Sequence, residues 1–141
     1  MQVLTEIIMD TIYDLENIRE FFKKDRFATE NGAVIDEVGD GYSRCSLLLT
    51  DRHQNAAGAV MGGVPFMLAD FAFAVACNSL KPSTVSLASN ITFYGVCRGS
   101  RLIAEAHCVK EGRTTCYYTI DVTDDLGNKV AAVTTNGFKK A

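Results

Sequence analysis

The segment from Val64 to Cys77 constrains the fold of this chain more than any other feature, because it is apolar on nearly every side of a helix. Its large apolar side chains are those of Phe66, Met67, Leu68, Phe71, Phe73 and Val75. The segment contains Asp70 and is shorter than the ~18–20 residues that a helix needs to span a bilayer. A helix that is hydrophobic all round is enclosed by its own sheet or by a partner chain. We therefore expect a buried helix and no membrane association.

Strand patterns flank this helix on both sides. Apolar and polar residues alternate most clearly over 85–94, and short turns, most of them with glycine, separate the neighbouring runs. The predicted strands are 33–38 and 42–50 before the helix, and 85–94, 102–110, 114–123 and 129–138 after it. Consecutive strands joined by short turns are antiparallel neighbours. The pattern predicts an α+β fold in which an antiparallel β-sheet wraps around one long central helix.

The length of 141 residues is typical of a single domain, which we expect to span 1–141. The apolar spacing from Asp14 to Lys24 predicts a one-sided helix with Asp14 as its N-cap. Residues 1–13 carry weaker helical spacing and are expected to form an N-terminal extension. They lack the basic start of a secretory signal, so we expect a cytoplasmic protein.

Charge and cysteine usage exclude several classes of function. The chain has 14 basic and 17 acidic residues and no dense run of Lys or Arg, so we expect no nucleic-acid partner. The five cysteines form no Cys-x-x-Cys pair and fit a reduced compartment. The two histidines, His53 and His107, lie far apart in the sequence. We therefore expect neither a metal site nor a bound cofactor.

Asp70 is the first candidate for chemistry. An unpaired carboxylate is costly in an apolar helix, so its side chain must reach either a partner or a cleft. One interpretation is a general base or nucleophile, since desolvation raises a carboxyl pKa. The other is a carboxylate that caps a neighbouring loop or faces a polar seam. The sequence alone favours the two equally.

The start of the helix is the second candidate. Gly62-Gly63 precede Val64-Pro65, and N–H groups at the positive end of a helix suit a developing oxyanion. The alternative is steric, with glycines required where the chain turns tightly into the helix. Gly62 is the better oxyanion candidate. Just before it, Asn55 can offer an amide to a carbonyl or a water, while His53 is either a base or, more commonly for such a loop, a brace.

These residues together resemble the hotdog-fold acyl-CoA thioesterases of the phenylacetate-degradation (PaaI-like) group. The matching positions are His53, Asn55, Gly58, Val60, Gly62-Gly63, Leu68-Ala69-Asp70, Ala72, Ala74, Ala76-Cys77-Asn78-Ser79, Val85-Ser86, Asn90-Ile91-Thr92-Phe93 and Arg98-Gly99-Ser100-Arg101-Leu102. The resemblance implies a homodimer, or a tetramer built from dimers, with active sites at the dimer interface. It implies that Asp70 is the general base or nucleophile and that the Gly62 N–H polarises the thioester carbonyl. Asn55, from the opposite protomer, would lie near the thioester, and Ser86 would help to position water.

Two positions depart from the group's pattern: Met61 and Val96, where a proline is common before the Arg-Gly turn. Met61 stands where the group usually has histidine, and methionine cannot donate a hydrogen bond. Ala74 stands where related groups use a threonine that holds water. We expect reduced or altered activity from Met61 rather than none.

The expected function is hydrolysis of the thioester of an aromatic or medium-chain acyl-CoA to free acid and CoA. The alternative is a non-catalytic acyl-CoA binding or sensing module, and a hydratase is less favoured because neither histidine is placed to pair with the carboxylate. Candidate substrate-binding residues are Met61 and Gly63 at the start of the helix, Phe66 and Phe73 as lining of the acyl pocket, and Arg98, Arg101 and Arg113 for the phosphates of CoA. For each arginine, a solvated surface position is expected at least as much.

Overall fold

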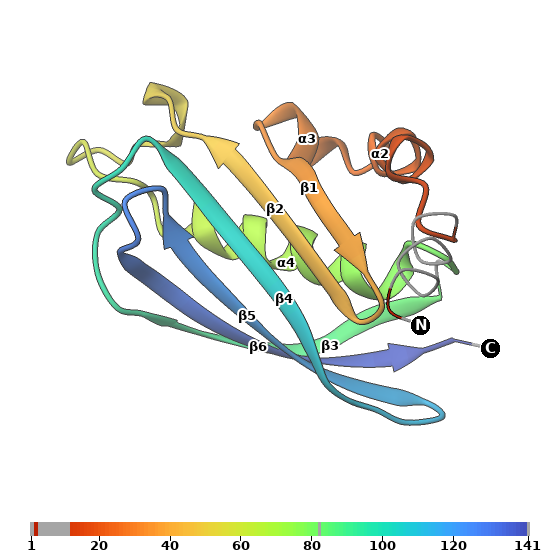
Figure 1. Ribbon diagram of the computed structural model, residues 1–141. Coiled ribbons are helices and arrows are strands. Elements are labelled where there is room, and N and C mark those ends of the chain that lie inside the picture. The colour runs from red at the N-terminus through yellow and green to blue at the C-terminus, as the bar shows by residue number, and fades with distance from the viewer. Residues whose placement is uncertain (1, 3–11, 82, 141) are drawn as a thin grey trace.

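A computed structural model describes residue 2 and residues 12–81 and 83–140, and it shows a six-stranded antiparallel sheet around one long helix (Figure 1). The helices are α2 (Leu15–Phe22), α3 (Arg26–Glu30) and α4 (Gly63–Asn78), with a short 3-10 turn η1 (Asp51–His53). The strands are β1 (Val34–Gly39), β2 (Tyr42–Leu48), β3 (Thr84–Phe93), β4 (Arg101–Glu111), β5 (Thr115–Asp124) and β6 (Lys129–Lys139). The α+β class and every predicted strand are confirmed.

The spatial order of the strands is β1-β2-β4-β5-β6-β3. Two sequence neighbours, β2 and β3, are therefore separated across the sheet, because α4 lies between them in the chain. Gly41, with φ of 63°, makes the tight β1–β2 turn that its left-handed backbone permits. The strand β3 pairs with β6 alone among the described strands, so its other edge carries unpaired backbone groups.

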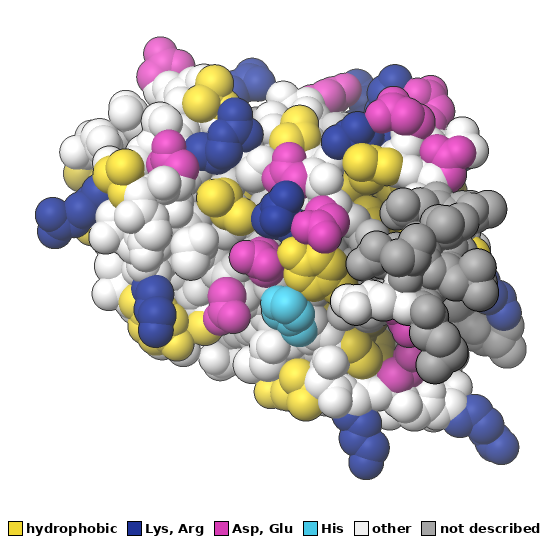
Figure 2. Space-filling model, in the orientation of Figure 1, with side chains coloured by type: hydrophobic (Ala, Val, Ile, Leu, Met, Phe, Trp, Pro, Cys, Tyr) yellow, Lys and Arg dark blue, Asp and Glu magenta, His cyan; other side chains and the backbone are white. Residues whose placement is uncertain are grey.

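The helix α4 packs on the concave face of the sheet. Leu68, Ala72 and Val75 are fully buried there against strands β2, β4 and β5. The opposite face of the sheet, turned toward the viewer in Figure 2, carries charged side chains of both signs. On that face Arg44 pairs with Glu37 at 3.1 Å, as is common on a solvated surface.

The segment before β1 folds into two short helices rather than one. Asp14 caps α2 as predicted, since its carboxylate accepts a hydrogen bond from the N–H of Asn17. The prediction of one helix to Lys24 missed α3, which begins after Asp25. Together α2 and α3 cover Phe71 of α4, and Phe22 meets that ring edge-on at 6.0 Å. The helical spacing expected over 1–13 lies almost wholly outside the described residues.

Two turns at one end of the sheet are tied together by carboxylates. We call this cluster, formed by 98–101 and 124–128, the turn lock. Asp124 accepts hydrogen bonds from the N–H groups of Arg98 and Gly99, and Asp125 accepts from Ser100 and Arg101. A Cβ at Gly99 would overlap Oδ1 of Asp125, which explains the glycine. The lock holds the start of β4 against the β5–β6 turn.

Candidate active site

Asp70 lies midway along α4 on a stripe that the described residues leave uncovered. The stripe, formed by Phe66, Met67, Asp70, Ala74 and Cys77, follows one side of the helix and is half-buried or exposed. No described residue donates a hydrogen bond to the Asp70 carboxylate. The structural alternative from the sequence was a carboxylate that caps a neighbouring loop or faces a polar seam. No loop cap is formed among the described residues, which leave the carboxylate open to a ligand.

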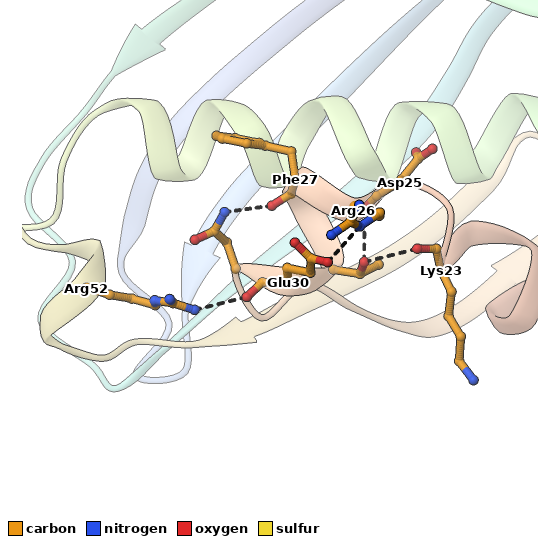
Figure 3. Close-up of polar contacts among 8 residues, drawn as sticks. Lys23, Asp25, Arg26, Phe27, Glu30 and Arg52 are labelled. Carbon is orange, nitrogen blue, oxygen red and sulfur yellow. Dashed lines mark hydrogen bonds and ion pairs between the residues drawn. The ribbon is translucent and has the colours of Figure 1, made fainter.

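A cavity of about 300 Å³ opens beside this carboxylate. Its lining residues come from α4 and from the segment around α3: Asp25, Arg26, Phe27, Ala28, Met67, Asp70 and Phe71. Figure 3 shows the side chains of Asp25 and Phe27 pointing from α3 toward α4. Partial burial removes water from the Asp70 carboxyl and raises its pKa above the ordinary value. The negative charge of the nearby Asp25 raises this pKa further. The cavity thus combines apolar walls with a carboxyl poised to bind a proton.

The wall formed by α3 was missed by sequence reasoning. An Asp directly before a helical run is a start signal, so Asp25 could have indicated a second helix. Nothing in the sequence places that helix beside Asp70. One contact of that helix with the rest of the fold is a hydrogen bond from the η1 turn, in which Arg52 donates to the carbonyl of Glu30 at 3.0 Å (Figure 3).

His53 is a brace and not a base. Its ring is buried; Nδ1 accepts a hydrogen bond from the N–H of Thr50 at 3.0 Å, and Nε2 lies 2.7 Å from the carbonyl of Asn31. Since the carbonyl can only accept, the proton sits on Nε2 and both ring nitrogens are occupied. His53 therefore ties the end of α3 to the loop that leads into α4. Its own carbonyl accepts the N–H of Met61 at 2.9 Å, next to Gly62.

Gly62 occupies the N-cap position of α4, and its N–H has no acceptor among the described residues. Such N–H groups at a helix start lack partners within the helix and carry its positive end. A Cβ at Gly62 would lie 3.1 Å from Cζ of Phe93, so close packing by β3 also disfavours a side chain here. Both interpretations of Gly62, the donor and the steric one, thus have structural support.

Asn55 shapes the loop before Gly62. Its Oδ1 accepts hydrogen bonds from the N–H groups of Ala57 and Ala59 at 3.0 and 3.1 Å. Its Nδ2 donates to no described residue, so both N–H groups of the amide remain available while the oxygen holds the loop. Ser86 lies on exposed β3 opposite Gly137, on the face of the sheet that carries α4.

The substrate-binding candidates are spread over the molecule. Met61 is 55% exposed next to Gly63 at the helix start, and Phe66 is half-buried on the uncovered stripe. Phe73 is buried in the core against Tyr118, at 5.3 Å between ring centroids, and it lines no described cavity beside Asp70.

The three arginines do not converge. Arg98 is exposed on the turn lock, and Arg101 beside it donates to Oγ of Ser46 at 3.2 Å. Arg113 lies in the β4–β5 turn at the other end of β4, about 33 Å away for ten residues of strand at ~3.3 Å each. Only Arg98 and Arg101 could hold the same phosphate group within one chain.

No described helix is long and apolar enough to cross a membrane. No group of three or more His, Cys, Asp or Glu in the described part of the chain could hold a metal ion.

Comparisons with known proteins agree on one family. The profile of the Thioesterase superfamily matches residues 57–131, which include Gly62, Asp70 and Ser86. A protein of Archaeoglobus fulgidus is 31% identical over 119 residues, 83% of this chain and 77% of that protein. The acyl-coenzyme A thioesterase PaaI of Escherichia coli is 30% identical over 117 residues, 82% of this chain and 84% of that protein.

The solved structures support the same assignment. The E. coli PaaI protein of the phenylacetic acid degradation operon superposes with a TM-score of 0.83 at 27% identity, covering 89% of this chain and 92% of that chain. A thioesterase-family structure from Streptococcus pneumoniae, solved with coenzyme A, has a TM-score of 0.75 at 26% identity and covers 85% of this chain and 99% of that chain. The chain therefore belongs to the thioesterase superfamily, as a PaaI-like member with the hotdog fold.

Proposed function

We propose that the protein hydrolyses acyl-CoA thioesters, with Asp70 as general base and the Gly62 N–H as oxyanion donor. The observation that carries this proposal is the Asp70 carboxylate beside a cavity, on the helix at whose start lies the Gly62 N–H, neither of which has a hydrogen-bond partner among the described residues. Relatives named acyl-coenzyme A thioesterase and a relative solved with coenzyme A support the substrate class.

The reaction uses one water molecule. Asp70 takes a proton from the water molecule while the water oxygen forms a bond to the thioester carbonyl carbon. The carbonyl oxygen becomes an oxyanion that accepts a hydrogen bond from the Gly62 N–H. When the C=O bond forms again, the C–S bond breaks, and the departing CoA thiolate takes the proton from Asp70. We assign the free Nδ2 of Asn55 to the thioester carbonyl and the Ser86 hydroxyl to the attacking water.

This chemistry requires two chains. Gly62 and Asp70 are eight residues apart on α4, which at about 1.5 Å per residue separates them by about 12 Å along the axis. A base that reaches the water and a donor that reaches the carbonyl oxygen must both lie about 3 Å from the reacting group. A donor and a base from the same chain are too far apart, so we infer that Asp70 of one protomer acts with Gly62 and Asn55 of another.

Two uncovered surfaces fit such a dimer. One is the open edge of β3, where Leu87 is 64% exposed and Phe93 is 53% exposed. The other is the apolar stripe of α4 around Asp70. Pairing two copies through these surfaces covers both, and sedimentation at micromolar concentration should show no species of 15.4 kDa. A stable monomer would contradict the shared site, and whether two dimers form a tetramer is read from the same experiment.

The cavity beside Asp70 supports an aromatic or medium-chain acyl group, because Phe27, Met67 and Phe71 form its apolar wall. Arg98 and Arg101 are the candidates for the CoA phosphates. The five cysteines are all free, which fits a reducing compartment such as the cytoplasm. A panel of aromatic and aliphatic acyl-CoAs, assayed for release of free thiol, tests the proposal.

Met61 favours a second candidate, a module that binds acyl-CoA without turnover. Its exposed thioether stands at the helix start, where the family usually offers histidine. If methionine has only removed a polar contact, Met61→His should raise kcat a few-fold on the substrates of the wild type. If the chain is a binding module, the wild type binds acyl-CoA without releasing thiol, and Met61→His weakens binding without creating turnover.

A further inference from the structure

A second cavity adjoins the cavity beside Asp70, and Phe71 lines both. It has a volume of about 340 Å³, within the range of small-molecule sites, and it lies between α2, α3 and β1. Its apolar lining comes from Phe22, Ala33, Val34, Ile35 and Phe71. The proposed function makes no use of this cavity.

Phe71 is the one described residue that lines both cavities. It follows Asp70 directly in the chain, and its ring is 3% exposed. Helix α3 also lies between the two cavities, since Ala28 lines the first cavity and its neighbour Thr29 lines the second. A chain that started at Asp70 and grew along the first cavity would therefore meet the Phe71 ring and then the second cavity.

The polar groups around the second cavity are already paired. The Arg19 guanidinium donates to the carbonyl of Ile35 at 2.8 Å and pairs with Glu16 at 2.7 Å. Lys23 pairs with Glu20 at 2.6 Å. With both cations occupied, the cavity offers an occupant apolar walls and no free charge, which suits the uncharged tail of an aliphatic chain.

We propose that Phe71 sets the length of acyl group that the protein accepts, by closing the cavity beside Asp70 against a second, apolar cavity that only a longer aliphatic chain would reach. The proposal rests on the proposed function and adds to it a residue that determines specificity. Phe71 acts as a wall: a smaller side chain joins the two cavities into one channel.

The experiment measures kcat/KM for a series of straight-chain saturated acyl-CoAs. In the wild type, kcat/KM falls steeply beyond a limiting length. Phe71→Leu should move that limit upward and raise kcat/KM for the first excluded length by about 10-fold relative to shorter substrates, since a methylene in an apolar pocket changes kcat/KM by about 10-fold or more. Phe71→Ala should move the limit further.

Two further variants separate this role from a loss of packing. Phe22→Leu is the matched control, because Phe22 packs on Phe71 and lines only the second cavity, so the limit should stay at the wild-type length. Adding Val34→Trp to Phe71→Leu fills the second cavity from a half-exposed position on β1 and should restore the wild-type limit. Melting temperatures show that each variant is folded.

The proposal is overturned if the Phe71 variants change kcat/KM by the same factor at every length, or if Val34→Trp leaves the extended limit in place. Failure of the proposed function gives a different result, namely no thiol release from any substrate by the wild type. In that case calorimetry measures the Kd of the wild type and the variants for the same series of acyl-CoAs, which stay intact. The same shift of the limit supports the role of Phe71 in binding, and parallel changes refute it.

Discussion

Two carboxylates in this chain show opposite outcomes of burial. Asp124 in the turn lock is only 2% exposed, yet its pKa lies well below the ordinary value. Burial opposes its ionisation, but hydrogen bonds from Asn128 and from backbone N–H groups of Arg98 and Gly99 outweigh that effect. Asp70 keeps more contact with solvent, accepts no hydrogen bond from the described residues, and has a raised pKa.

The backbone donors differ in the same way. In the turn lock the N–H groups of Arg98 and Gly99 are consumed by one carboxylate, whereas the N–H of Gly62 has no described acceptor. A satisfied cluster stabilises the fold, and an unsatisfied pair of donor and carboxylate is available to a substrate. Donors, and not burial alone, distinguish the structural aspartate from the candidate catalytic one.

Asp70→Asn tests the contrast most strongly. If Asp70 is the base, kcat should fall by about 10²–10⁴ while acyl-CoA affinity remains, because the change removes proton acceptance but little volume. The pKa of Asp70 is higher in the folded than in the unfolded state. Ionisation of Asp70 therefore lowers the free energy of unfolding as pH rises from the unfolded-state pKa through the folded-state pKa. The variant should therefore melt at an equal or higher temperature at neutral pH. Full activity, or a loss of activity that follows unfolding, would end the assignment.

Gly62→Pro removes the unpaired donor itself. If the N–H stabilises the oxyanion, kcat should fall by about 10²–10³ with little change in acyl-CoA binding. Proline is tolerated in the first turn of a helix, which makes the variant feasible, although Phe93 packs closely on this position. Sedimentation and circular dichroism first establish a folded dimer. Unchanged turnover in that dimer would remove Gly62 from the mechanism.

Asp124→Asn should have the converse phenotype. An amide would turn an NH₂ group toward N–H donors, so we expect the melting temperature to drop on the order of 5 °C, with kcat retained below the transition. The pH dependence has the opposite sign from Asp70. Because the pKa of Asp124 is lower in the folded state, its ionised form adds to the free energy of unfolding. This contribution is fully present above the unfolded-state pKa and is lost as pH falls through the folded-state pKa. Melting scans between neutral and acidic pH should show this loss in the wild type and not in the variant.

Asp25→Asn gives the smallest expected effect. The Asp25 carboxylate helps to raise the pKa of Asp70, so its neutralisation should lower that pKa. Because the ionised base is the active form, the acid limb of the kcat/KM profile should move to lower pH with nearly unchanged kcat at its plateau. Glu37→Gln, which removes a charge that pairs with Arg44 on the face of the sheet opposite α4, is the control and should leave the limb in place. Identical profiles for wild type and Asp25→Asn would show that the two carboxylates do not interact.

The sequence by itself determined most of the elements and the candidate reactive groups. The period-two runs predicted the strands, the all-round apolar segment predicted α4, and the single Asp within it identified Asp70. These features are local, since they depend on side-chain spacing and on the cost of placing a charge in an apolar helix. The second helix α3 was missed because its five residues are too few to show a period.

Only the tertiary structure decided how these groups lie in space. It made His53 a brace, because Asn31 and Thr50 occupy both ring nitrogens, and it placed Phe73 in the core and Arg113 far from the other arginines. It brought Asp25 and Asp70 to one cavity and set Phe71 between two. Such contacts join segments tens of residues apart, and no local pattern encodes them, because they depend on how the sheet curves and on what then covers the helix.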